Sequence, residues 1–148
     1  MKEFQAYLKE GKVKKKRIEI AEAQSLITQS KERMADLHHL PLTEKNASFR
    51  FEDGYEALRE ALQAFLALDG YKPYSHEAVF CYALEQNLLS EAQYHQADRY
   101  REIRNDINYR GKIVTVEEAK ELIEFVETLL PILENNFEQR LIENKEDL

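Results

Sequence analysis

A chain of 148 residues, 33% charged and 43% hydrophobic, is long enough to fold as one compact domain with a buried core. It contains no apolar run near the roughly 18 residues that cross a membrane, and its N-terminus lacks the apolar segment of a secretion signal. The single cysteine, Cys81, cannot form an intrachain disulfide. We therefore expect a cytoplasmic protein that does not contact a membrane.

Charge is unevenly distributed along this acidic chain, whose net charge is −7. Residues 1–17 hold seven cations and two carboxylates, whereas residues 117–148 hold ten carboxylates and three cations. This polarity argues against a protein that binds nucleic acid over its whole surface and favours local basic patches.

The first predicted elements are a basic lead-in over residues 1–17 and a long first helix. Apolar residues recur three and four positions apart, so the helix is predicted to start within 14–18 and to reach about residue 40. Pro41 ends it. The run KVKKKR at 12–17 has two interpretations: a solvated entry to this helix, or a contact for RNA backbone.

A second helix is predicted from about residue 50, where large apolar residues form a strong stripe, to Gly70, a typical residue after a helix C-terminus. The connector YKPY follows, and its aromatic residues Tyr71 and Tyr74 are the tyrosines that we expect to be most exposed. Ser75 is predicted to cap a third helix.

Two capping-box patterns predict the last helices. Ser90 and Gln93 begin a fourth helix that ends near Gly111, and a second box, with Glu three residues after Thr115, begins a fifth. Pro131 is predicted to kink or break the fifth helix. Only KIV at 112–114 has any strand character. The prediction is an all-α, up-and-down antiparallel bundle of about five helices, one domain over 1–148 with its core at about 48–140.

The stretch RYREIRNDINYRG at 99–111 packs four arginines, two asparagines and two tyrosines into the fourth helix. On a helical wheel an edge of guanidinium and amide groups borders the apolar face, and the carboxylates of the stretch lie further round. Such a donor-rich edge suits phosphate and bases. The candidate binding residues are Arg101, Arg104, Asn105, Asn108 and Tyr109. The alternative is that the arginines form ion pairs with carboxylates of other helices.

The segment from about 48 to 135 resembles a HEPN domain, a small helical module of many prokaryotic toxin and defence systems. The resemblance depends on FEDGYEALREALQAFLALDGYKPYSHEAV and on YREIRNDINYRGKIVTVEEAKELIEFVETLL. The signature of the HEPN family is an arginine, a polar residue, and a histidine four to six residues after the arginine. Arg104 and Asn105 match the first two positions, and Tyr109 stands in place of the histidine.

The resemblance implies a homodimer in which Arg104 and the residue at position 109 meet across the subunit interface. In HEPN ribonucleases these groups promote attack of the RNA 2′-hydroxyl on the adjacent phosphate, without metal or cofactor. Tyr109 is a weaker base than histidine because its pKa is ordinarily about 10. Arg104 and Tyr109 are nevertheless the catalytic candidates, and whether the protein is an enzyme stays open.

Two functions therefore follow from the resemblance. One is binding of RNA or nucleotide at a dimeric cleft, with weak endoribonuclease activity as a possible addition. The other is a non-catalytic module paired with a minimal nucleotidyltransferase, for which Tyr109 could be a modification target. The histidines His38, His39, His76 and His95 are interpreted as surface or packing residues, and no metal site is predicted.

Overall fold

The computed structural model describes the backbone of residues 2–146 and the side chains of residues 2–144. This part of the chain is all-α, as predicted, with six helices where about five were expected, and a sheet of two short strands. In chain order the elements are α1 (Phe4–Lys9), β1 (Val13–Lys15), α2 (Ile20–His39), α3 (Ala47–Leu68), β2 (Tyr71–Pro73), α4 (His76–Glu85), α5 (Glu91–Arg110) and α6 (Val116–Glu146).

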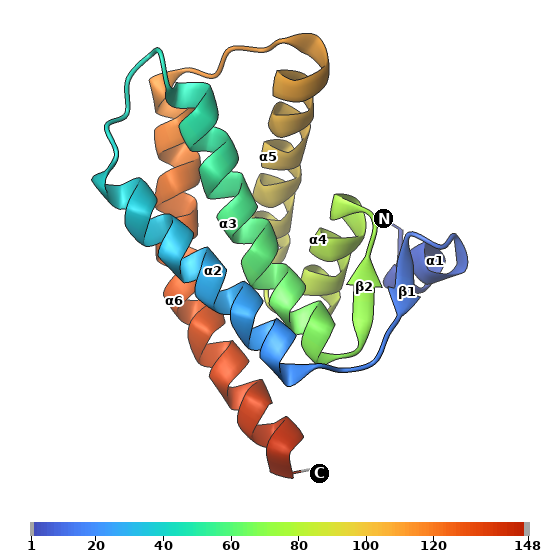
Figure 1. Ribbon diagram of the computed structural model, residues 1–148. Helices are drawn as coiled ribbons and strands as arrows, with labels where there is room; N and C mark the ends of the chain where they lie inside the picture. The colour runs from blue at the N-terminus through green and yellow to red at the C-terminus, as the bar shows by residue number, and fades with distance from the viewer. Residues whose placement is uncertain (1, 147–148) are drawn as a thin grey trace.

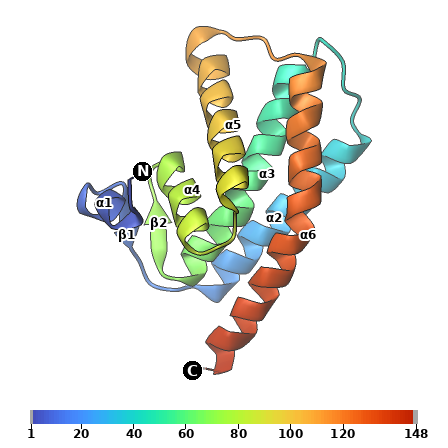
Figure 2. The same cartoon turned by 180° about the vertical axis from the view of Figure 1, so that it is seen from behind.

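Helix α3 is the centre of the fold, because fourteen of its 22 residues are buried. It packs against α2, α4, α5 and α6, and Figures 1 and 2 show α2 and α5 running opposite to α3 and α6. Burial on nearly all sides explains why this helix is rich in leucine, phenylalanine and alanine.

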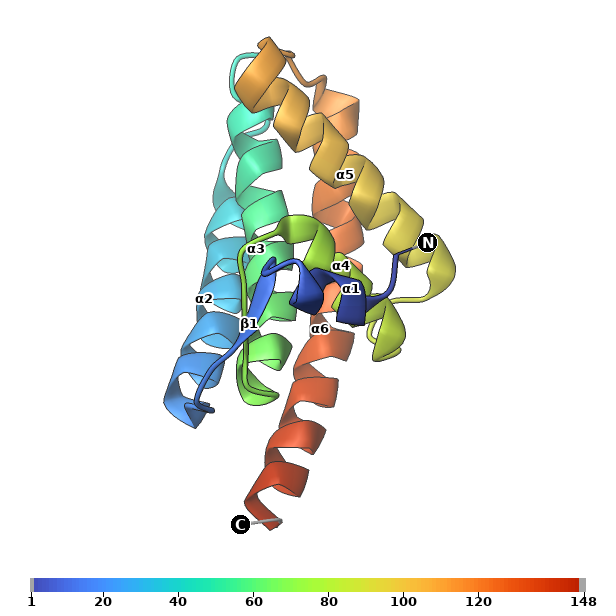
Figure 3. The same ribbon diagram turned by 90° about the vertical axis from the view of Figure 1, so that its right-hand side faces the viewer.

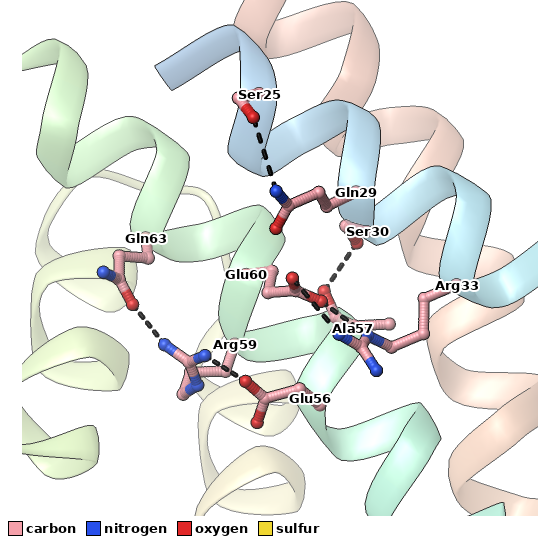
Figure 4. Close-up of polar contacts among 9 residues, drawn as sticks. All are labelled: Ser25, Gln29, Ser30, Arg33, Glu56, Ala57, Arg59, Glu60 and Gln63. Atoms are coloured by element: carbon pink, nitrogen blue, oxygen red, sulfur yellow. Dashed lines mark hydrogen bonds and ion pairs between the residues drawn. The ribbon is translucent and has the colours of Figure 1, made fainter. Parts of the chain in front are cut away.

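Polar side chains on α3 are satisfied on two sides of the helix (Figure 4). Toward α2, Ser30 donates a 2.6 Å hydrogen bond to the carbonyl of Ala57, and Glu60, only 3% exposed, accepts a 2.7 Å bond from Nε of Arg33. On another side Arg59 contacts Glu56 and Gln63. The contacts of Ser30 and Arg33 fix α2 close to α3, whereas those of Arg59 lie within α3.

The N-terminal segment corrects one prediction. Within the predicted basic lead-in, residues 2–17 contain α1 and the strand β1, and the first long helix begins only at Ile20 rather than within 14–18. Strand β1 pairs antiparallel with β2, with Val13 opposite Pro73 and Lys15 opposite Tyr71. Val13 is 1% exposed, so one buried residue anchors a strand too short to have a recognisable periodicity.

The predicted helix ends are confirmed. Gly70 follows α3 with a φ of +82°, and a Cβ there would lie 3.0 Å from the carbonyl oxygen of Lys16, so the position requires glycine. Ser75 caps α4, Ser90 and Gln93 form a complete capping box on α5, and Thr115 accepts a bond from the backbone N–H of Glu118.

Near α6 the structure contains no strand at KIV and no break at Pro131, so of the two alternatives predicted for the proline the break is wrong. The tripeptide KIV is an irregular connector: the N–H of Val114 donates a 3.0 Å bond to the Ser48 hydroxyl. Helix α6 continues without a break past Pro131. The proline is exposed, and so is Glu127, whose carbonyl loses its helical partner, so water can replace the missing bond.

Candidate functional site: a pocket between α4 and α5

A shallow pocket lies where the N-terminus of α4 meets the middle of α5. It has a volume of about 160 Å³. Strand β2 delivers the chain into α4 at this point, and α5 crosses α4 at an angle (Figure 3). The lining residues are Ser75, His76, Glu77, Arg101, Arg104 and Asn105. Three of the five predicted binding residues, Arg101, Arg104 and Asn105, therefore line this pocket.

Arg101 is neutralised by carboxylates, which corrects the prediction of an acid-free edge. Its side chain is 14% exposed, Nε donates a 2.8 Å bond to Asp98, and Nη1 lies 3.5 Å from Glu77. Glu77 comes from α4, so the helical wheel of α5 could not show it. Arg101 joins α4 to α5, and little of its charge is left for a ligand.

Arg104, one turn further along α5, has a different environment. Among the described residues no carboxylate forms an ion pair with it. With the Asn108 amide turned so that its nitrogen donates to Glu52 at 2.8 Å, its oxygen accepts a 3.1 Å bond from Arg104 Nε. The guanidinium carbon lies 5.8 Å from the ring centroid of Tyr55. These contacts orient the arginine and leave its terminal nitrogens for an anion.

His76 is the residue of this pocket that sequence reasoning missed. Its Nδ1 lies 2.8 Å from the hydroxyl of Tyr55, a fully buried residue of α3. Burial, together with the nearby cations Arg59 and Arg104, lowers the pKa of His76 to about 4. The imidazole is therefore neutral at pH 7. The sequence offers only one indication of this site, the position of His76 directly after the Ser75 cap.

The proton arrangement of His76 follows from Tyr55. The Tyr55 hydroxyl has no other hydrogen-bond partner among residues 2–144, so it donates its proton to Nδ1. The imidazole hydrogen must then be on Nε2. His76 is thus a neutral N–H donor beside a cationic guanidinium, a combination suited to an anionic oxygen.

The other three predicted binding residues differ in their position relative to the pocket. Asn105 lines the pocket, and Asn108 supports Arg104 from its edge. Tyr109 is 82% exposed and is not among the residues that line the pocket. Within one chain, therefore, the side chains of Arg104 and Tyr109 do not share this site.

Comparison of the chain with protein-family models, curated protein sequences and solved structures gives no significant match. None of the helices among the described residues combines the length and apolar character needed to cross a membrane. Those residues also contain no group of three or more His, Cys, Asp or Glu side chains placed to hold a metal ion. Function is therefore inferred from the chemistry of the pocket itself.

Proposed function

We propose that this is a HEPN-like RNA-binding protein of the prokaryotic toxin–antitoxin or defence type, which holds an RNA or nucleotide phosphate in the pocket between α4 and α5. The observation that carries the proposal is the difference between two arginines one turn apart. Arg101 is neutralised by Asp98 and Glu77, whereas Arg104 is oriented by uncharged groups and has no acidic partner among the described residues. An arginine held ready in this way suits a phosphate.

Neighbouring groups support the same ligand. Asn105 adds an amide, and His76 adds a neutral N–H donor that costs no charge repulsion beside Arg104. Three kinds of donor then line one pocket. Glu77 also lines the pocket, and its pairing with Arg101 reduces its repulsion of the ligand.

Cleavage is the second part of the proposal. In the metal-independent reaction the 2′-oxygen bonds to phosphorus, its proton passes to a base, and the 5′-oxygen leaves with a proton, giving a 2′,3′-cyclic phosphate. His76 with a proton on Nε2 is a donor rather than a base, so any cleavage by this pocket is slow. Tyr109 can contribute to this pocket only from a second subunit, so a homodimer is part of the proposal. We also propose that the protein acts in the cytoplasm.

The test is binding of a fluorescein-labelled single-stranded RNA of about twelve nucleotides in EDTA. Arg104→Ala is expected to weaken binding about 10- to 100-fold, the loss of charge-assisted hydrogen bonds. Arg99→Ala is the matched control, because Arg99 lies on the same helix but faces Glu121 of α6 at 3.2 Å. Its effect should stay within about twofold. Equal binding, or equal absence of binding, by wild type and Arg104→Ala would refute the proposal.

A pairing with a minimal nucleotidyltransferase is the second candidate. The exposure of Tyr109 favours it, because a hydroxyl this accessible at the end of α5 could receive a nucleotidyl group. Co-expression with such an enzyme followed by mass spectrometry should then show one added nucleotide on Tyr109. An unmodified tyrosine would count against this alternative.

A further inference from the structure

The two-stranded sheet presents a basic face with one aromatic ring. Lys14 and Lys72 are register partners across β1 and β2, and the N–H of Tyr74 donates a 2.7 Å bond to the carbonyl of Lys12. Because side chains two residues apart on a strand point to the same side, these four residues share one face. We call Lys12, Lys14, Lys72 and Tyr74 the lysine–tyrosine face. Val13, which alternates with the lysines, is buried on the opposite side.

The charges of this face are not compensated. Among the described residues no carboxylate forms an ion pair with Lys12, Lys14 or Lys72, although the chain carries a net charge of −7. Lys16, just beyond β1, differs from them because it forms an ion pair: its Nζ lies 2.5 Å from a carboxylate oxygen of Glu22. Three lysines gathered without acids repel one another, and a polyanionic ligand would relieve that repulsion.

Tyr74 gives the face a second property. Its side chain is 57% exposed, and the Nζ atoms of Lys14 and Lys72 lie 5.4 and 5.5 Å from its ring centroid. Lysines alone would suit any polyanion. An exposed ring close to two ammonium groups adds a surface on which a nucleobase can stack while its phosphates meet the cations.

The chain connects this face directly to the pocket. Tyr74 is followed by Ser75 and His76, which line the pocket with Arg104. Figure 1 shows the two strands beside the start of α4. The lysine–tyrosine face and the pocket are therefore neighbours along the chain, at the β2–α4 junction.

We infer that the lysine–tyrosine face binds the single-stranded RNA segment next to the phosphate held in the pocket, with a base on Tyr74 and the backbone along the lysines. This inference rests on the proposed function only in that one RNA strand reaches both places. Successive lysines on one strand are two residues, or about 6.6 Å, apart, comparable with one nucleotide step of an extended strand. An anionic membrane surface would use the lysines but would not need the ring.

The experiment measures binding of a labelled RNA of about twelve nucleotides over a range of salt concentrations, with labelled inorganic phosphate as the short probe. Each lost phosphate contact on a single strand lowers the salt slope by about 0.7, so Lys14→Gln with Lys72→Gln should lower it by about 1.4. Lys45→Gln with Lys120→Gln is the charge-matched control, since both lysines are exposed and lie away from the sheet, in the turn before α3 and on α6. The control should leave the slope unchanged.

The ring has its own pair of variants. Tyr74→Ala should weaken binding of the longer RNA roughly tenfold, and Tyr74→Phe should retain binding because stacking needs the ring and not the hydroxyl. None of these variants should change binding of inorganic phosphate, which is small enough to occupy the pocket alone. Circular dichroism establishes that each variant has kept its helices.

The outcomes separate this inference from the proposed function. If Arg104→Ala weakens both probes while the strand variants change neither, the lysine–tyrosine face is not an RNA site and the pocket stands. If the strand variants weaken the longer RNA but Arg104→Ala has no effect, the face binds RNA and the proposed function fails. Equal loss with Tyr74→Ala and Tyr74→Phe, or tighter binding to anionic phospholipid vesicles than to RNA, would overturn the inference.

Discussion

At the scale of single residues, the surroundings of a side chain decide its role more than its type does. Arg101 and Arg104 are both half-buried arginines on α5, separated by one turn. A carboxylate from α4 neutralises the first, whereas an amide and an aromatic ring support the second. The first is therefore a link between helices, and the second is available to a ligand.

His76 should make the folded state sensitive to mild acid. Its pKa is about 4 in the fold and ordinarily 6.5, so between these values the unfolded chain binds more protons. Stability is thus fully present above pH 6.5 and falls as the pH drops toward 4. Allowing for partial exposure, we expect a loss of about 1 kcal/mol between pH 7 and pH 5 from this group.

Urea unfolding of wild type and His76→Asn at pH 7 and pH 5 measures that loss. Asparagine cannot titrate, and its amide oxygen can still accept the bond from Tyr55, so the variant should lose less stability on acidification. His95→Asn is the control, because His95 is well exposed on α5 and should behave as wild type does. An identical acid response of wild type and His76→Asn would mean that His76 titrates normally.

At the scale of elements, α6 shows how a helix accommodates a proline in its interior. Pro131 lies midway along 31 helical residues, with its ring and the affected carbonyl of Glu127 on the exposed side. Pro131→Ala restores the missing N–H and removes the ring clash. The substitution also gives the unfolded chain more conformational freedom, which lowers the gain in the free energy of unfolding. The net stabilisation should be about 1–2 kcal/mol.

Thermal unfolding followed by circular dichroism measures this stabilisation, and the expected rise in Tm is about 2–8 °C. Glu138→Ala, at another exposed position of the same helix, is the control and should change Tm little. A lower Tm for Pro131→Ala would show that the proline ring contributes packing or that its rigidity outweighs the lost bond.

Elements defined by neighbouring residues were predictable, and those defined by distant ones were not. Ser75, the Ser90–Gln93 box and Gly70 act on backbone groups within a few residues, so the sequence predicts where these helices begin and end. Strand β1 has only three residues and pairs with a segment nearly sixty residues later in the chain. Neither strand has a pattern of its own, so their pairing could emerge only from the fold.

At the scale of the whole molecule, the same reasoning explains which parts of the candidate site were predictable. Arg104 and Asn105 belong to one helix and were found from its pattern. His76 and Glu77 reach the pocket only because α4 packs beside α5, which no single helical pattern encodes. The unpaired lysines of the N-terminal region likewise become one surface with Tyr74 only through the sheet. An acidic molecule thereby gathers three lysines that have no ion pair among the described residues on one local surface.

The proposed homodimer makes a further prediction about the exposed Tyr109. Within one chain Tyr109 is outside the pocket that contains Arg104, so a composite site would need Arg104 of one subunit and Tyr109 of the other. In a two-fold dimer each subunit then contributes to both sites. A variant of either residue would lose both sites of its own homodimer, yet the two variants could complement each other.

Mixing Arg104→Ala with Tyr109→Ala under conditions of subunit exchange tests this arrangement. About half of the random dimers would be mixed, and each mixed dimer would have one intact site, so about a quarter of the RNA-binding sites should return. Titration with labelled RNA counts these sites, and analytical ultracentrifugation verifies the dimer. Mixing Arg104→Ala with Arg104→Gln is the control and should restore none. If Tyr109→Ala binds RNA by itself as wild type does, the site belongs to one subunit, because Arg104 does not need the partner's Tyr109. If neither variant binds RNA alone and the mixture of dimers recovers nothing, the composite site is refuted.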